Sequence, residues 1–180
     1  RDRGYSVRYP GTWTLVTTAN TTRGVFLRNP FNAEENLFVN CSSPSSSNYS
    51  SVRDLGSPED AAKGVIDRYL NEFMSTRLGI RRESEIVRAG EREGKDGRLY
   101  YDVAVRIRSF AASNQYGLTQ QERPQTLEWD RTQLASFGVE NKRLYELRIQ
   151  VPSSKYTTDE GQLQEILDSF ELFTMEPGKT

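Results

Sequence analysis

The sequence predicts an α+β protein built on an antiparallel sheet, and three observations lead to this fold class. Residues 99–107 and 144–151 alternate apolar and polar side chains with period two, which is typical of half-buried strands. Residues 95–97, Lys-Asp-Gly, form a hairpin turn signal just before the first of these strands. Apolar residues within 62–73 recur every three or four positions, which predicts an amphipathic helix. Strands that follow one another through short turns favour antiparallel pairing.

The first third of the chain is predicted to contain short strands. Alternation or β-branched and aromatic content places them at residues 5–9, 13–16, 24–28 and 37–39. Residues 30–36 are expected to connect the last two. Residues 42–51 are rich in serine and contain Pro44, so they are predicted to form a loop.

The clearest helix begins after Ser57. Ser57 suits the N-cap, Pro58 suits the first helical position, and the acidic residues 59 and 60 favour the positive end of the helix dipole. Ser57 and Asp60 have capping-box spacing, although Glu or Gln is the usual partner. Gly79 is a natural C-terminal stop. The apolar stripe predicts packing against a sheet and consists of Ala62, Val65, Ile66, Tyr69, Leu70 and Phe73.

The second half is predicted to form strands at 84–91, 99–107 and 144–151, the last ended by Pro152. A polar excursion at about 111–133, with Gly117 and Pro124, is predicted to be a long loop or hairpin. Thr157 or Thr158 can cap a final helix whose apolar face holds Leu163, Ile166, Leu167 and Phe170. With no internal repeat and no linker, residues 1–180 are expected to form a single domain.

Composition excludes several functional classes. The chain has 24 Lys+Arg and 25 Asp+Glu, so it lacks the basic excess of a nucleic-acid binder. No apolar run is long enough to cross a bilayer. The first residue is Arg1 rather than Met, so we expect a processed or trimmed form whose targeting segment lies outside the sequence. The only cysteine, Cys41, is predicted to be a small buried hydrophobe, with a reactive or partner-linking thiol as the alternative.

Residues that carry catalysis are scarce. The chain has no histidine, which closes the commonest acid–base and nucleophilic routes and removes the commonest nitrogen ligand for metals. We therefore predict no enzyme activity, no catalytic residue, no metal site and no cofactor. Gly90, Gly94 and Gly97 do not fit a phosphate-binding pattern. Three close acidic pairs remain as weak candidates: Glu34-Glu35, Glu83/Glu85 and Asp159-Glu160.

A basic surface is the most suggestive candidate for partner binding. Arg106 and Arg108 are expected on the outer face of one strand, and Arg148 on the outer face of another, beside Glu146. If these strands pair, the charges form a cross-strand ladder that contributes under about 1 kcal/mol per pair. The alternative is a docking face for an acidic partner.

Several motifs, taken in order, resemble the PsbP family of lumenal proteins associated with photosynthetic complexes. Residues 5–13, YSVRYPGTW, resemble the family's opening strand and turn. Further similar segments follow in the family's order, namely residues 24–29, 35–37, 54–58, 96–101, 142–145 and 167–170. The resemblance spans nearly the whole chain.

The resemblance implies an α–β–α sandwich around a central antiparallel sheet, the PsbP/Mog1-like fold. It also implies a processed protein of the chloroplast thylakoid lumen, peripheral to the membrane and expected to be a monomer. Such proteins are extrinsic subunits or assembly factors of photosystems. In the oxygen-evolving branch, members help to retain calcium and chloride near the manganese cluster.

Two departures from the family pattern matter. Thr132, after Arg131, stands where the family often has His after a basic residue, so a polar or metal-binding candidate is missing. The long N-terminal arm of the major oxygen-evolving subunit is also not seen. Both departures favour a PsbP-domain relative over the major subunit and weaken the expectation of direct ion retention. The polar excursion is the segment where we look for partner specificity.

Three functions are therefore compared. The first is a non-enzymatic lumenal accessory or assembly protein that binds photosystem II or another thylakoid complex. The second is a soluble protein-binding module outside the thylakoid, similar to the Mog1 family, which binds a nuclear-transport GTPase. The third is a small enzyme that uses acidic residues, which predicts converging carboxylates with raised pKa values in a concave pocket.

Overall fold

The computed structural model describes residues 4–16, 24–43, 48–72, 79–112 and 125–174. Within these ranges one sheet has seven strands in the order β2-β3-β4-β8-β7-β6-β5, and every neighbouring pair is antiparallel. A second, two-stranded sheet pairs β1 with β9. The elements in chain order are β1 (Tyr5–Ser6), β2 (Thr14–Leu15), β3 (Val25–Asn29), β4 (Asn32–Cys41), η1 (Val52–Leu55), α1 (Pro58–Glu72), β5 (Ile80–Glu93), β6 (Leu99–Ala112), β7 (Gln125–Glu140), β8 (Arg143–Pro152), α2 (Ser153–Asp168) and β9 (Glu171–Leu172).

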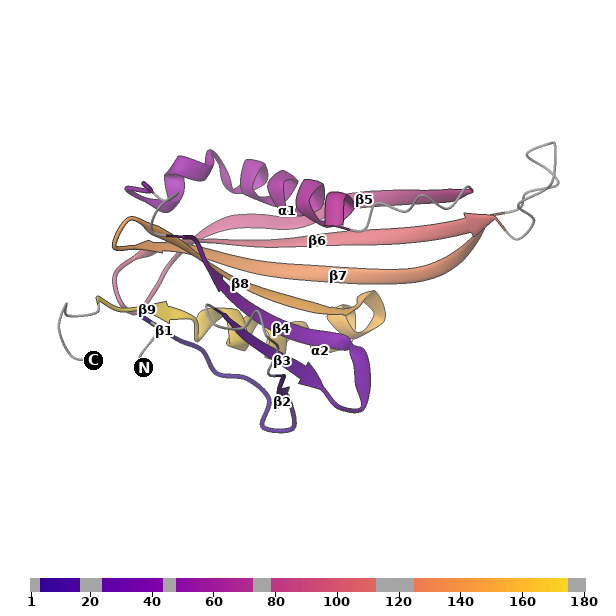
Figure 1. The fold of residues 1–180 in the computed structure, drawn as a ribbon, viewed down its shortest axis with the longest axis horizontal. Helices are drawn as coiled ribbons and strands as arrows, with labels where there is room; N and C mark the ends of the chain where they lie inside the picture. Colours follow the sequence, from indigo (N-terminus) through magenta and orange to yellow (C-terminus); the bar gives the residue numbers. More distant parts are fainter. Residues whose placement is uncertain (1–3, 17–23, 44–47, 73–78, 113–124, 175–180) are drawn as a thin grey trace.

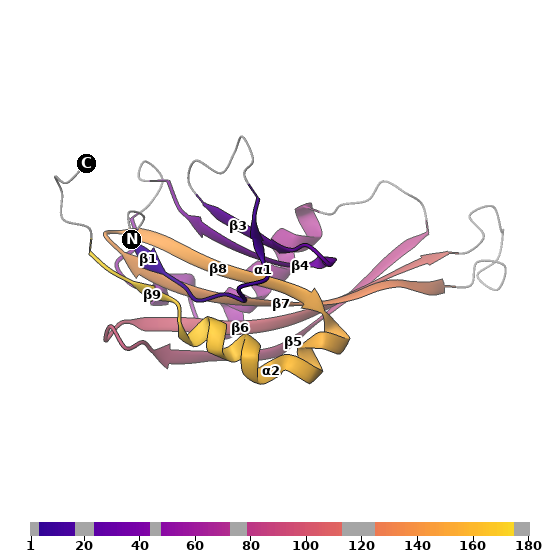
Figure 2. The ribbon, with the colours of Figure 1, turned by 90° about the horizontal axis from the view of Figure 1, so that it is seen from below.

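The two helices cover opposite faces of the large sheet, as Figures 1 and 2 show. Helix α1 packs on β5 and β6, whereas α2 packs on β7 and β8. Each helix closes its own apolar cluster, with Tyr101, Val103 and Val105 of β6 under α1, and Tyr100 and Ala104 of the same strand on the α2 side. The predicted α–β–α sandwich is confirmed. None of the described helices has the length and apolar content that crossing a membrane needs.

The start of α1 is the predicted one. The backbone N–H of Asp60 donates to Ser57 Oγ at 3.2 Å, and the backbone N–H of Ser57 donates to the Asp60 carboxylate at 3.1 Å. An aspartate thus completes the capping box in place of the usual Glu. Residues 73–78 lie outside the described part, so the predicted helix end at Gly79 is not tested. Gly79 itself has φ +80° and leads into β5.

The sequence predicts a long loop or a hairpin at about 111–133, and the described part fits the hairpin. Ala111 and Ala112 end β6, and residues 125–133 belong to β7, which pairs with β6 from Tyr101↔Phe137 to Ala112↔Gln125. Residues 113–124 lie outside the described part. Strand β7 continues into β8 through a turn at Asn141 and Lys142, which have φ of 51° and 59°. Two successive positive φ values make a type I′ turn, whose twist suits a hairpin.

Two further boundaries differ from the prediction. Helix α2 begins at Ser153, immediately after Pro152, rather than at a cap on Thr157 or Thr158, and its backbone is kinked at Asp159. The residues predicted as a connection between two strands, 30–36, mostly belong to β4, which begins at Asn32. The turn there is consequently short and rigid.

Strand β6 is buried on both faces over much of its length, not half-buried as its alternation predicts. Asp102, on the polar side of the pattern, is only 7% exposed because α2 covers that side. Arg92 of β5 donates from Nε to the Asp102 carboxylate at 2.7 Å, and the same guanidinium donates to the carbonyl of Leu167 at the end of α2. This buried pair therefore ties α2 to the sheet.

Candidate docking surface

Arg106 and Arg108 lie on β6, and Arg106 lines a hollow together with the first turns of α2. The register places Arg106 opposite Thr132 of β7 and Glu85 of β5. The Thr132 hydroxyl lies 2.9 Å from the hydroxyl of Ser153, the first residue of α2. Both arginines therefore lie on the α2 side of the sheet.

The two arginines are paired with acidic side chains from both neighbouring strands. Arg106 donates to Asp130 of β7 at 2.9 Å and lies 3.5 Å from Glu85 of β5. Arg108 lies 3.4 Å from Glu83 and 3.8 Å from Glu85. The hydrogen bond from Arg106 outweighs burial and holds the pKa of Asp130 below its usual value. Because Arg81 also pairs with Glu83, the cluster contains three cations and three anions, so it is not a basic surface.

Arg148 lies on the opposite face of the sheet. It is opposite Ala135 of β7, whose side chain belongs to the cluster under α1. Its guanidinium lies 3.3 Å from Glu146, which is 4% exposed and also accepts two hydrogen bonds of 2.9 Å from Arg68 of α1. A single face containing Arg106, Arg108 and Arg148 is therefore wrong, because β7 separates β6 from β8 and the arginines point to different sides. Whether any of them binds a partner stays a prediction.

A hollow of about 610 Å³ adjoins Arg106. Its walls are β5 at Glu85–Val87 and the first turns of α2, and Asp130 and Thr132 form part of its lining. Ile86 and Val87 are 37% and 44% exposed where the β5 register shifts. Thr132 is 1% exposed, and its hydroxyl lies 2.9 Å from that of Ser153. The position thus holds α2 against the sheet.

The acidic pairs proposed from the sequence do not converge on a reacting site. Glu34 accepts from Arg131 at 2.8 Å, Glu35 accepts from Lys155 at 2.8 Å, and Asp159 lies 3.6 Å from Lys155. Glu83 and Glu85 belong to the arginine cluster described above. Among the described carboxyl groups with a clear pKa shift, hydrogen bonds lower the pKa in every case, whereas the enzyme hypothesis predicts raised values. The described residues also contain no group of three side chains able to hold a metal ion.

A second, open groove of about 740 Å³ runs between the N-terminal segment at Ser6–Pro10 and the last turns of α2. Its charged lining is mixed, with Arg8, Lys95, Glu165, Asp168 and Glu171. Cys41 lies elsewhere, on β4. It is 8% exposed, and burial raises the pKa of its thiol. The thiol therefore behaves as a buried apolar group rather than a reactive one.

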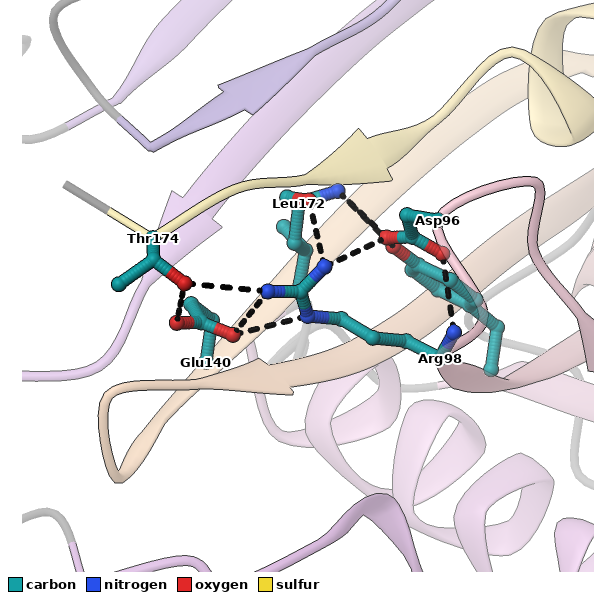
Figure 3. Close-up of polar contacts among 6 residues, drawn as sticks. Asp96, Arg98, Glu140, Leu172 and Thr174 are labelled. Carbon is teal, nitrogen blue, oxygen red and sulfur yellow. Dashed lines mark hydrogen bonds and ion pairs between the residues drawn. The ribbon is translucent and has the colours of Figure 1, made fainter.

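A polar cluster around Arg98, shown in Figure 3, was not predicted from the sequence. Arg98 follows the β5–β6 turn and donates to Glu140 of β7 at 2.8 Å and to the carbonyl of Leu172 at 3.0 Å. Burial would raise the pKa of Asp96, but hydrogen bonds from Tyr100 and from the backbone amides of Arg98 and Leu172 hold it below its usual value. The cluster fixes β9, and with it β1, to two hairpin ends. The sequence did contain one local signal for this cluster, because Asp96 stands two residues before Arg98.

The comparisons with known proteins decide the family. The PsbP family model matches residues 1–172. The chain belongs to the PsbP family. It is 47% identical over 169 residues to "PsbP domain-containing protein 1, chloroplastic" of Arabidopsis thaliana, a match that covers 94% of this chain. The chain spans 58% of the length of that relative.

Two solved structures are compared with this chain. The Ran-binding protein Mog1p of Saccharomyces cerevisiae matches with a TM-score of 0.49 at 13% identity, over 94% of this chain and 90% of that chain. The solution structure of cyanobacterial PsbP (CyanoP) from Synechocystis sp. PCC 6803 superposes with a TM-score of 0.67 at 21% identity, over 96% of this chain and 88% of that chain. The CyanoP superposition confirms the PsbP-like fold and its α+β class.

Proposed function

We propose that this PsbP-family chain is a non-enzymatic accessory or assembly protein that binds photosystem II or another thylakoid complex from the lumenal side. The observation that carries the proposal is the extent of the family match. It covers residues 1–172, and a chloroplast relative is 47% identical over nearly all of this chain. At this identity the same sandwich and the same surface elements are expected in both proteins.

The described side chains support a binding role over catalysis. Buried acids are occupied in holding elements together, as Asp102 does with Arg92, Glu146 with Arg68, and Glu35 with Lys155. Acid–base catalysis needs a group whose proton affinity is tuned to the reaction and which faces a substrate. The molecule also presents a long sheet whose β5–β7 end extends past both helices (Figure 2). Residues 125–128 at the start of β7 are exposed.

Fractionation of chloroplasts tests the location and the association together. Antibodies against the chain would be used on intact thylakoids treated with protease, with and without detergent, and on native gels of the solubilised membranes. We expect protection in intact thylakoids, digestion once detergent opens them, and co-migration with a photosystem-sized complex. Recovery of the chain outside the chloroplast would favour a soluble module of the Mog1 type. Recovery only as a free protein, even after cross-linking, would contradict the proposal.

A further inference from the structure

The turn between β3 and β4 presents one aromatic side chain almost fully to solvent. Phe31 is 88% exposed, the highest value among the large hydrophobic side chains that the structure describes; Leu15 is next, at 62%. Isolated exposed apolar residues are common on protein surfaces and need no explanation by themselves. The case for Phe31 depends on how its backbone is held.

The turn itself is short and is fixed by side chains. Asn29 pairs with Asn32, so only Pro30 and Phe31 form the tip. Proline fixes its own φ, and the Asn29 side-chain oxygen accepts a hydrogen bond of 3.0 Å from the backbone N–H of Phe31. The Asn32 side-chain oxygen accepts from the backbone N–H of Glu34 at 3.1 Å. Both asparagines thus hold the backbone on either side of the aromatic residue.

A buried carboxylate holds both asparagines in turn. Glu35 is 4% exposed, and its two oxygens accept hydrogen bonds of 2.9 Å from the side-chain amides of Asn29 and Asn32. Lys155 of α2 donates to the same carboxylate at 2.8 Å, which ties the turn to the body of the protein. Burial would raise the pKa of Glu35, but the bonds from Lys155 and the two amides keep it below its usual value.

This arrangement holds the backbone under a side chain that contributes little to its own fold. An exposed phenylalanine buries almost no apolar surface, and position i+2 of a tight turn favours other residue types for conformational reasons. Binding anchors, by contrast, are aromatic, and they bind more tightly when their conformation is already fixed, because less entropy is lost on association. A fully exposed ring on a fixed turn has both properties.

We propose that Phe31 is the anchor of a docking tip and inserts into an apolar pocket on a protein subunit of the bound complex. This inference rests on the proposed function, because it names the contact through which the chain would bind. The tip is bordered by polar groups, namely the exposed Arg28, the two asparagines and the Glu34–Arg131 ion pair. An apolar centre with a polar rim is the usual anatomy of a protein–protein contact.

A protein pocket fits the tip better than a lipid surface does. Even a whole myristoyl chain gives only marginal and reversible membrane binding, so a single phenyl ring is far too little to hold the chain on a bilayer. Burying one ring in a pocket, on the other hand, accounts for about 10- to 100-fold in affinity. We therefore expect Phe31→Ala to weaken binding to the thylakoid complex by about that factor.

Binding of purified chain to detergent-solubilised thylakoid complexes tests the anchor. Phe31→Ala would be compared with the wild type and with Leu15→Ala, which truncates a 62% exposed side chain on β2. We expect the dissociation constant to rise for the first variant only, at unchanged urea midpoints for both. Glu35→Gln is expected to weaken binding less than Phe31→Ala, because it loosens the turn without removing the ring. A photo-cross-linking amino acid at position 31 should label one subunit, and the same group at position 15 should not.

These experiments distinguish failure of the Phe31 anchor from failure of the proposed function. If the wild type binds and Phe31→Ala binds equally well, the anchor is wrong and the proposed function stands. If the wild type binds no thylakoid complex, both are wrong. Binding to vesicles of thylakoid galactolipid composition tests the alternative of a lipid contact. Co-sedimentation of the wild type with vesicles, lost in Phe31→Ala, would show a lipid contact and would overturn the protein pocket.

Discussion

Removing the Arg98 side chain should release β9 and β1 from the rest of the fold. Arg98→Ala deletes the hydrogen bonds to Glu140 and to the Leu172 carbonyl and leaves Glu140 and Asp96, whose side chains are 12% and 11% exposed, without their cation. Breaking a buried pair on one side costs about 3–5 kcal/mol. Because 27% of the Arg98 side chain is exposed, water replaces part of the loss, and we expect the free energy of unfolding to fall by about 3 kcal/mol.

Urea unfolding measures this effect. With an m-value of about 2 kcal/mol/M, the loss lowers the midpoint by about 1.5 M. Arg53→Ala is the matched control, because it removes an arginine whose pair with Glu91 is exposed at 68% and 44% and contributes at most about 1 kcal/mol. Hydrogen exchange should also speed up at Leu172 and Phe173 more than in α1. A midpoint equal to that of Arg53→Ala, or unchanged exchange in β9, would refute the reasoning.

Three smaller predictions concern the fold. Gly138→Ala should lower stability by about 2 kcal/mol in urea unfolding, because a Cβ there would lie 2.7 Å from the buried Tyr100 ring; a wild-type midpoint would show that the ring moves freely. Ser57→Ala should cost about 1 kcal/mol through the lost cap of α1, with Ser57→Thr close to wild type. The free energy of unfolding should be constant between pH 5.5 and 7, because the chain has no histidine. It should fall below about pH 4.5, because Glu35, Asp96 and Asp130 have lowered pKa values in the folded state and take up protons first in the unfolded chain. A free energy of unfolding that rises on acidification through pH 4 would contradict this sign.

Local signals predicted the parts of the fold that local physics decides. The α1 start followed from Ser57 and Asp60, because a cap is made by residues three apart. The β5–β6 turn followed from Asp96-Gly97, and Gly97 does adopt a positive φ of 73°. The apolar face of α2 was also found, since Leu163, Ile166 and Leu167 are buried.

Strand β7 escaped prediction because its stability comes from partners distant in the sequence. Its first half is polar, with Thr126, Glu128 and Asp130, and resembles a loop by composition. In the structure Thr126 and Asp130 pair with β6, and Asp130 binds Arg106 across the strands. The order of the strands could not be predicted from the sequence either. The structure places β7 between β6 and β8, and Arg148 points to the opposite face of the sheet from Arg106 and Arg108.

The buried charges were the other omission. Asp102 and Glu146 fall at alternate, polar positions of their strands, which predicts exposure on a one-sided sheet. Here helices cover both faces, so each acid is buried against an arginine, Arg92 for the first and Arg68 for the second. A single sequence does not show which face a helix will cover. The tip at Phe31 likewise depended on Glu35, whose partners lie on three different elements.

The proposed function requires that this PsbP-family chain binds a thylakoid complex. Equilibrium binding of the purified, immobilised chain to separately isolated photosystem II, photosystem I and other thylakoid complexes, by biolayer interferometry at moderate salt, measures this directly. We expect saturable binding to one of them, weakened by Phe31→Ala. If no complex binds saturably, the proposed function is wrong.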